Sequence, residues 1–166
     1  MNNTNPFIYS DDNKRYHTLN YYNKSSFNSK VFKAVIDAGF TCPNKDGTKG
    51  TGGCIYCMGG SGYFTEKSNG EIYDSVKRQL AAEKERIYKK HPDSLITAYF
   101  QANTNTYAPV ATLKEAYTAA LDFGVHGISI GTRADCLPDD VIALLCDINS
   151  KTHLTVELGL QTIHDK

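Results

Sequence analysis

The chain has 166 residues, 40% of them hydrophobic, which is enough for one compact core and too few for two separate domains. Its 18 basic and 18 acidic residues cancel, which excludes an overall positive field for binding nucleic acid and leaves only a local basic patch for that role. The longest unbroken apolar run, 141–146, is far shorter than the ~20 residues of a membrane helix, and the first residues lack the apolar core of a signal peptide, so we expect a cytoplasmic protein without a membrane partner.

The amino-terminal part of the chain has two different compositions. Residues 1–15 are polar, rich in Asn and without periodicity, so we expect a disordered tail before a domain that spans 16–166. Aromatic residues then mix with basic ones at Tyr16, Tyr21, Tyr22 and Phe27. Such a mixture can contact nucleic acid by stacking and charge, but packing of these rings on the outside of the domain is the favoured interpretation.

The rest of the chain alternates between strand-like and helix-like patterns. We expect strands at 31–37, 95–103, 127–133 and 153–161, and helices at 68–90, 112–123 and 138–149. The helix boundaries carry local signals, namely capping boxes at Ser68 with Glu71 and Thr112 with Glu115, a stop at Gly124, and a first-turn proline at Pro138. This order predicts an α/β fold of parallel strands with right-handed helical crossovers.

Within the last three expected strands, apolar and polar side chains alternate. The apolar set is Ile96, Ala98, Phe100, Ile128, Ile130, Val156, Leu158 and Leu160, and polar residues or glycines stand between them. Because helices on both faces of a sheet require strands that are apolar on both sides, we expect helices on the apolar face only. The polar face then lines a lumen, as in a partial (β/α) barrel. The alternative, an antiparallel sheet with one face in water, fits the regular helices less well.

Three cysteines lie within the stretch GFTCPNKDGTKGTGGCIYC, residues 39–57. Eleven residues separate Cys42 from Cys54, and two separate Cys54 from Cys57. The stretch is rich in Gly and follows the first strand, and chemistry gathers at the carboxyl ends of the strands in such barrels. Three thiolates suit three irons of a [4Fe-4S] cluster, with the fourth iron open to an exogenous ligand. Other polar residues expected at the same rim are Asn103, Asn105, Thr106, Thr132, Arg133, Asp135 and Gln161.

Other interpretations of these cysteines stay open at this point. Structural zinc needs four closed ligands, and here only Cys54 and Cys57 form a close pair, with no nearby His. A thiol-redox Cys-x-x-Cys pair normally heads a helix directly after a strand, whereas this pair lies among glycines. Spacing alone favours iron–sulfur over zinc only modestly. The two remaining cysteines, Cys136 and Cys146, are expected to be buried in the core.

Several stretches together resemble one enzyme family. They are RYHTLNYYNKSSF, DAGFTCPNKDGTKGTGGCIYC, YFQANTNTYAP, SIGTRADCLPDDVIALL and VELGLQT. With them the chain resembles the radical S-adenosylmethionine (radical SAM) enzymes, in particular the bacterial branch of iron–sulfur oxidoreductases similar to the radical SAM domain of the elongator catalytic subunit. The gap of eleven residues after Cys42 departs from the commonest family spacing but is similar to the longer gap of that branch.

The resemblance implies roles for individual residues. Cys42, Cys54 and Cys57 would ligate the cluster, and Tyr56 would lie against the adenine of S-adenosylmethionine. Asn103 and Asn105 lie where many members bind the methionyl amino group, although the Gly-Gly-Glu-type motif of those members is absent from this sequence. The resemblance also implies cofactor or substrate contacts for Arg133, Glu157 and Gln161, for which hydrogen bonding within the lumen is an equal alternative.

The resemblance also implies a reaction and a partner. A reductant protein such as flavodoxin or ferredoxin would reduce the cluster, which would cleave S-adenosylmethionine to a 5′-deoxyadenosyl radical that abstracts hydrogen from a substrate. The substrate is unknown, with tRNA as one candidate. Because barrels of this family are longer, we expect a chain truncated after its fourth strand, an open half-barrel that associates and binds cofactor with or without turnover. The alternative function is a non-catalytic zinc-binding or thiol-redox module.

Overall fold

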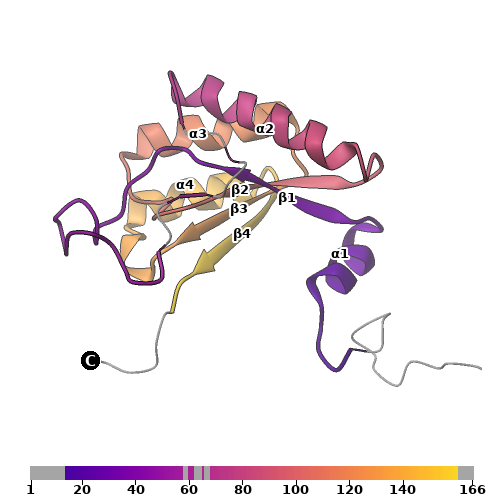
Figure 1. Cartoon of the computed structure of the whole chain (residues 1–166), viewed down its shortest axis with the longest axis horizontal. Helices are drawn as coiled ribbons and strands as arrows, with labels where there is room; N and C mark the ends of the chain where they lie inside the picture. The colour runs from indigo at the N-terminus through magenta and orange to yellow at the C-terminus, as the bar shows by residue number, and fades with distance from the viewer. Residues whose placement is uncertain (1–13, 58–59, 62–64, 66–67, 161–166) are drawn as a thin grey trace, which may run out of the picture.

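Four parallel strands form a single sheet in the computed structural model of the chain, which describes residues 14–57, 60–61, 65 and 68–160. The strands lie side by side in chain order as β1 (Val31–Ile36), β2 (Leu95–Phe100), β3 (Gly127–Thr132) and β4 (His153–Leu158). The crossovers carry α2 (Ile72–Tyr88), α3 (Val110–Phe123) and α4 (Asp139–Asn149), with the short 3₁₀-helix η1 (Ala134–Cys136) before α4. The predicted α/β class with parallel strands is confirmed (Figure 1).

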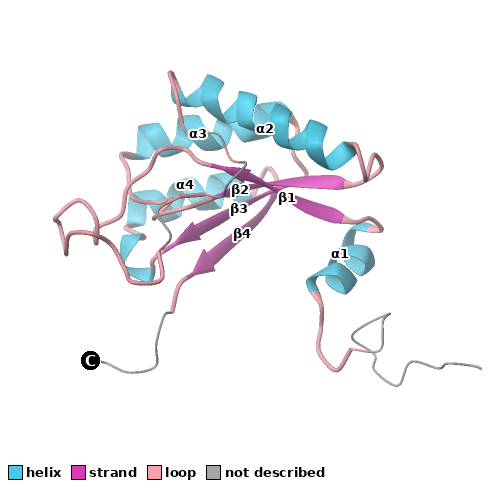
Figure 2. Ribbon diagram, viewed as in Figure 1, coloured by secondary structure: helices cyan, strands magenta, loops and turns pink. Residues whose placement is uncertain are grey.

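One apolar core lies between the sheet and the three crossover helices, which cover the same face (Figure 2). Alternate residues of the strands are buried in it, as predicted for Ala98, Phe100, Ile128 and Ile130, and Ala34 and Ile36 of β1 follow the same pattern. Tyr117 of α3 is fully buried, and its ring lies edge-on to Phe100 with 5.1 Å between centroids. Each apolar side chain removed from water in this layer stabilises the fold by roughly 1.5–3 kcal/mol before entropy is counted.

The helix-start predictions are wrong in their details. Helix α2 begins at Ile72, with Glu71 as an N-cap that makes no side-chain cap bond, so the expected pairing of Ser68 with Glu71 does not form. Helix α3 begins at Val110, two residues before the expected box, because Pro109 (φ −54°) already fixes a backbone angle that suits a helix start. Pro138 is the N-cap of α4 and not part of its first turn.

The ends of the strands also differ from the expected bounds. Each strand stops one to three residues earlier than predicted, at Ile36, Phe100, Thr132 and Leu158. The polar residues that follow leave the ladder and turn into the rim loops, with Asn103 in a left-handed conformation (φ 66°). Gly124 ends α3 with φ 81°, as predicted, because glycine enters this left-handed region without a Cβ clash.

A helix that the sequence did not reveal, α1 (Leu19–Phe27), lies beside the amino ends of the strands, away from α2, α3 and α4 (Figure 1). Thr18 caps it by accepting a hydrogen bond from the Tyr21 amide at 3.1 Å. With Lys33 and Thr97, α1 lines a small cavity of about 90 Å³ on the polar face. The expectation that helices cover only the apolar face is therefore wrong at this end of the sheet.

The aromatic segment packs in part, since Phe27 is in contact with the sheet, but Tyr16 is 62% exposed.

The far edge of the sheet exposes apolar side chains. Leu158 and Leu160 were expected on the buried face, but they are 52% and 79% exposed. Helix α4 covers β4 only as far as Val156, which packs against the core together with Leu154. Within the part of the chain that the structure describes, no helix combines the length and apolar character that crossing a membrane requires.

A cluster of aromatic and imidazole rings joins α1 to the sheet and should make stability depend on pH. Phe27 lies 4.3 Å from the ring of His126 and 5.1 Å from that of His153. Burial, and then the neighbouring His153, lower the pKa of His126 below its ordinary 6.5, and its Nε2 has no hydrogen-bond partner. The unfolded chain therefore takes up this proton at higher pH than the folded chain does.

We accordingly expect the free energy of unfolding to fall as pH drops below about 6.5. Urea unfolding at a series of pH values between about 7.5 and 5 measures this slope. The variant His126→Phe should show a shallower slope, because its side chain cannot take up a proton. Equal slopes for the two proteins would show that His126 does not contribute.

Candidate functional site

The cysteine stretch folds into a turn-rich loop beyond the carboxyl end of β1. The amides of Lys45 and Asp46 donate to the carbonyl of Cys42 at 2.8 and 3.1 Å, and a short antiparallel bridge joins Asp46 to Thr51. The loop returns on itself at Gly53 (φ 79°), whose amide donates to the Asn44 carbonyl at 2.9 Å. A side chain at Gly53 would be strained by this φ and would crowd Lys45, with 3.1 Å from its Cβ to the Lys45 side chain.

The thiols of this loop, residues 42–57, differ in exposure and in how closely they are placed. Cys42 and Cys54 are partly buried and Cys57 is exposed, and each is a free thiol. Cys54 and Cys57 share one turn, closed by a 2.9 Å bond from the Cys57 amide to the Cys54 carbonyl. Among the described residues, however, no three His, Cys, Asp or Glu side chains stand where together they could hold a metal ion. The structure thus pairs two of the predicted ligands but does not gather all three.

Hydrogen bonds and nearby cations favour the thiolate form of Cys54. A hydrogen bond from Tyr56 and a second from Asn44 Nδ2, at 3.2 Å from the sulfur, lower the pKa of the Cys54 thiol, and the charges of Arg133 and Lys45 add to this effect. The same bond to Cys54 raises the pKa of the Tyr56 phenol. A thiol biased toward its thiolate is suited to metal ligation and to nucleophilic chemistry.

Arg133 and Asp135, which follow β3, form an ion cluster with the cysteine loop. Arg133 donates to both carboxylate oxygens of Asp135 at 2.8 Å, and Lys49 of the loop makes an ion pair with the same carboxylate. These bonds hold the pKa of Asp135 well below its ordinary value, and they raise the pKa of Arg133. The predicted rim residue Arg133 therefore lies at the cysteine loop, but its guanidinium N–H groups already donate to the carboxylate of Asp135.

The two predicted asparagines make bonds within the protein. Asn103 donates to the Phe40 carbonyl at 2.8 Å and accepts from Lys45 Nζ at 2.6 Å, so it ties the cysteine loop to the end of β2. Asn105 is only 1% exposed, and its amide group donates to the carbonyls of Ala102 and Gly131 at 2.9 and 3.0 Å. Both side chains position the rim loops.

Glu157 is the centre of a polar network that includes one residue from every strand. Lys33 of β1 makes an ion pair with its carboxylate, Tyr99 of β2 donates to it at 3.1 Å, and Ser129 of β3 donates at 2.7 Å. The Lys33 ammonium also lies 3.8 Å above the ring of Tyr99. Burial and the charge of Glu157 raise the pKa of Tyr99 to about 12, so its phenol stays protonated at neutral pH.

This network adjoins a cavity of about 350 Å³ at the rim. Residues of β2, β3 and β4 and of the segments that follow them line this cavity, and they include Tyr99, Gln101, Asn103, Thr132 and Glu157. The sheet thus has the polar face predicted from the sequence, and Glu157 makes hydrogen bonds on that face, the kind of role that was one of its two predicted alternatives. Lys33, Tyr99 and Ser129 were missed as site residues, although their alternation with buried apolar positions is visible in the sequence. Gln161 lies outside the described residues.

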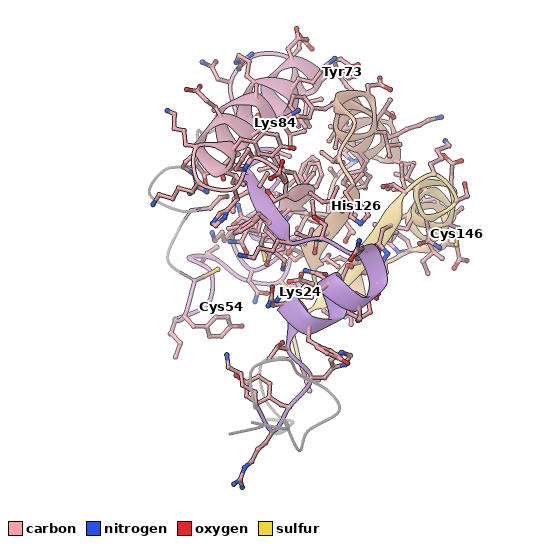
Figure 3. The ribbon with its side chains drawn as sticks, turned by 90° about the vertical axis from the view of Figure 1, so that its right-hand side faces the viewer. Lys24, Cys54, Tyr73, Lys84, His126 and Cys146 are labelled. Atoms are coloured by element: carbon pink, nitrogen blue, oxygen red, sulfur yellow. The ribbon has the colours of Figure 1, made fainter. Side chains whose placement is uncertain are left out.

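The two remaining cysteines have different environments. Cys136 is buried, as predicted, beside a second cavity of about 900 Å³ between the cysteine loop and the loops that follow β2 and β3. Cys146 is exposed, so the prediction of a buried thiol is wrong there. It lies off the buried stripe of α4, which is formed by Val141, Leu144, Leu145 and Ile148. Figure 3 shows Cys54 and Cys146 on opposite sides of the molecule.

Comparison with known proteins finds relatives without a named activity. The chain is 49% identical over 168 residues to the uncharacterized protein YtqA of Bacillus subtilis, with 100% of this chain and 51% of YtqA aligned. It is 39% identical over 142 residues to protein YhcC of Escherichia coli K12 (84% of this chain, 44% of YhcC), and 35% identical over 152 residues to the uncharacterized protein MJ0486 of Methanocaldococcus jannaschii (87% and 44%). The chain spans about half the length of these relatives. No family model and no solved structure matches it.

Loss of the Glu157 charge should destabilise the sheet at neutral pH. Burial by itself raises the pKa of Glu157, but the bonds from Lys33 and Ser129 outweigh burial, so the pKa lies below its ordinary 4.5. The carboxylate therefore stabilises the fold above that value, and this contribution is lost as pH falls through the folded-state pKa. The variant Glu157→Gln should lower the free energy of unfolding by about 1 kcal/mol at pH 7, a small effect because Lys33 and Glu157 are partly exposed.

Denaturant unfolding of both proteins checks this expectation. The difference between them should begin to shrink as pH falls below about 4.3, where the unfolded wild-type chain takes up the proton, and should be lost once the folded-state carboxyl is also protonated at lower pH. Asp147→Asn, which removes an exposed ion pair with Lys151 on α4, is the matched control and should change stability less. A difference that does not vary with pH would show that the charge of Glu157 is not what stabilises the sheet.

Proposed function

We propose that this chain is the cofactor-binding part of a radical SAM enzyme, in which Cys42, Cys54 and Cys57 hold a [4Fe-4S] cluster that binds S-adenosylmethionine. One observation carries the proposal. The thiol-bearing loop follows β1 of an all-parallel α/β sheet and lies at the rim, beside the ends of β2 and β3, to which Asn103 and Asp135 tie it. Ligands of α/β sheets bind at the carboxyl ends of parallel strands, so the position supports a site there.

The donor chemistry of the loop fits such a cluster. Cys54 is biased toward thiolate, and the Asn44 amide donates to its sulfur at 3.2 Å, the kind of bond that tunes iron–sulfur sites. In this loop conformation Cys42 lies apart from the pair formed by Cys54 and Cys57. Binding of a cluster by all three thiols would therefore have to bring Cys42 closer to that pair. Metal binding that orders its own site is usual, because the ligand bonds supply the free energy of ordering.

When bound, the cluster would supply an electron for the reductive cleavage of S-adenosylmethionine, and a flavodoxin or ferredoxin is the proposed reductant. The residues of the chain would bind and orient. Tyr56 is 56% exposed and free to stack on the adenine, while Arg133, Glu157 and Gln161 are the proposed contacts to the cofactor or the substrate. The rim cavity beside Glu157 would hold the reacting groups in a defined orientation. The substrate is proposed only as a class of molecule, and tRNA is one candidate.

A second function is favoured by one specific observation. Only Cys54 and Cys57 share a turn, and the pKa of Cys54 is lowered, which together describe a reactive dithiol. On this alternative the chain is a thiol-redox or zinc-binding module, and Cys42 takes no part.

Anaerobic reconstitution with iron and sulfide tests the proposal and separates it from the alternative. We expect the wild-type chain to bind about four irons, and the variants Cys42→Ala, Cys54→Ala and Cys57→Ala each to lose most of them. Cys146→Ala is the matched control and should keep full iron, because Cys146 is exposed on α4, on the opposite side of the molecule from Cys54 (Figure 3). Addition of S-adenosylmethionine should change the electron paramagnetic resonance spectrum of the reduced cluster.

Two results would contradict the proposal. If Cys42→Ala binds as much iron as the wild-type chain, Cys42 is not a cluster ligand. That result would favour the dithiol alternative. One tightly bound zinc per chain, with no iron incorporated, would assign the loop to zinc.

A further inference from the structure

A single carboxylate, that of Asp135, links the cysteine loop to the end of β3. It receives both arms of the Arg133 fork at 2.8 Å and the ammonium of Lys49, which comes from the tip of the loop. We propose that Asp135 is a positioning residue of the cysteine site, which ties down the loop tip and holds the Arg133 guanidinium in a fixed place beside the cysteine loop. This inference rests on the proposed function where it concerns the cluster, but the tie itself can be tested without metal.

The Arg133 side of the tie is geometrically restrictive. Two parallel N–H···O bonds fix both the position and the plane of the guanidinium, which a single contact would not do. The Arg133 side chain is only 27% exposed, so little of it is free to move into solvent. Through Asp135 and Lys49 the cation is joined to the same loop that carries the three proposed ligands.

The Lys49 side of the tie acts on the loop. Next to it, Thr48 shares a 2.9 Å hydrogen bond with Tyr107, so two neighbouring residues of the tip are joined to two different rim loops. The tip keeps its shape through the amides of Lys49 and Gly50, which both donate to the Pro43 carbonyl, at 2.8 and 3.2 Å. Lys45 makes a further tie, to Asn103, near the base of the loop.

Removal of the Asp135 charge should reverse the electrostatics of the tie. An isolated exposed ion pair stabilises a protein only slightly. Here, however, one carboxylate separates two cations, and without it Lys49 and Arg133 repel each other at close range. The loop tip would then move away from β3, and Arg133 would be free to approach the thiolates. Asp135 thus sets both the position of the loop and the amount of positive charge that the thiols experience.

Hydrogen exchange of the metal-free chain tests the tie. In Asp135→Asn we expect the Lys49 and Gly50 amides to exchange at least several-fold faster than in wild type, because their bonds to Pro43 open more often. Asp147→Asn, which removes the carboxylate of another exposed ion pair, should leave them unchanged, and Asp135→Glu should restore most of the protection. Wild-type exchange in Asp135→Asn would overturn the proposal.

The reduction potential of the reconstituted cluster tests the positioning role, which loss of structure alone would not reproduce. In Asp135→Asn the potential should shift to a more positive value, because an uncompensated Arg133 favours the reduced, more negative cluster. An unchanged potential in a variant that loads iron normally would overturn this role.

If wild type binds no iron but Asp135→Asn loosens the loop, the proposed function fails and the tie stands. If wild type binds iron and Asp135→Asn matches it in both measurements, the tie fails and the proposed function stands.

Discussion

The constraint on which this structure depends is the burial of one face of a parallel sheet beneath three crossover helices. Side chains alternate along a strand, so burial of Ile128 and Ile130 under α3 and α4 directs Ser129 to the opposite face. Parallel pairing in chain order then places every strand's carboxyl end at the same rim. The apolar core therefore decides on which face, and at which edge of the sheet, the polar side chains lie.

The rim is built largely from side chains whose hydrogen bonds are made within the protein. Asn103, Asn105 and Asp135 each join two segments that are distant in the sequence. Such bonds are worth about 1 kcal/mol each, but they give the loops defined positions relative to the strands. Polar residues at a rim thus divide into groups that hold loops in place and groups that face open space, and the sequence does not distinguish the two. Tyr56, which is 56% exposed, belongs to the second group, whereas Glu157 both makes hydrogen bonds within the sheet and lines the rim cavity.

The sequence predicted the order and type of the main elements because their hydrophobic periods are strong. It failed where a different force decides the outcome. Pro109 starts α3 before the capping box, and α1 was missed because it buries only Asn23 within its own length, so its period is weak. Cys146 and Leu158 look like core residues, but Cys146 lies off the buried face of α4 and Leu158 lies beyond the part of β4 that α4 covers. The spacing of Cys42, Cys54 and Cys57 identifies candidate ligands, whereas their distances depend on a loop path set by turns and ion pairs.

The contact between Lys33 and Glu157 has a consequence for the shape of the sheet. These residues belong to the two outermost strands, which in a flat sheet would lie three strand spacings, or about 14 Å, apart. The register also places Lys33 level with His153, four residues before Glu157, so in a flat sheet the two side chains would be too far apart to meet. Their ion pair therefore favours a sheet that bends concave toward its polar side. The curvature of the sheet therefore depends partly on charge. A substitution that neutralises Lys33 or Glu157 would allow the sheet to flatten.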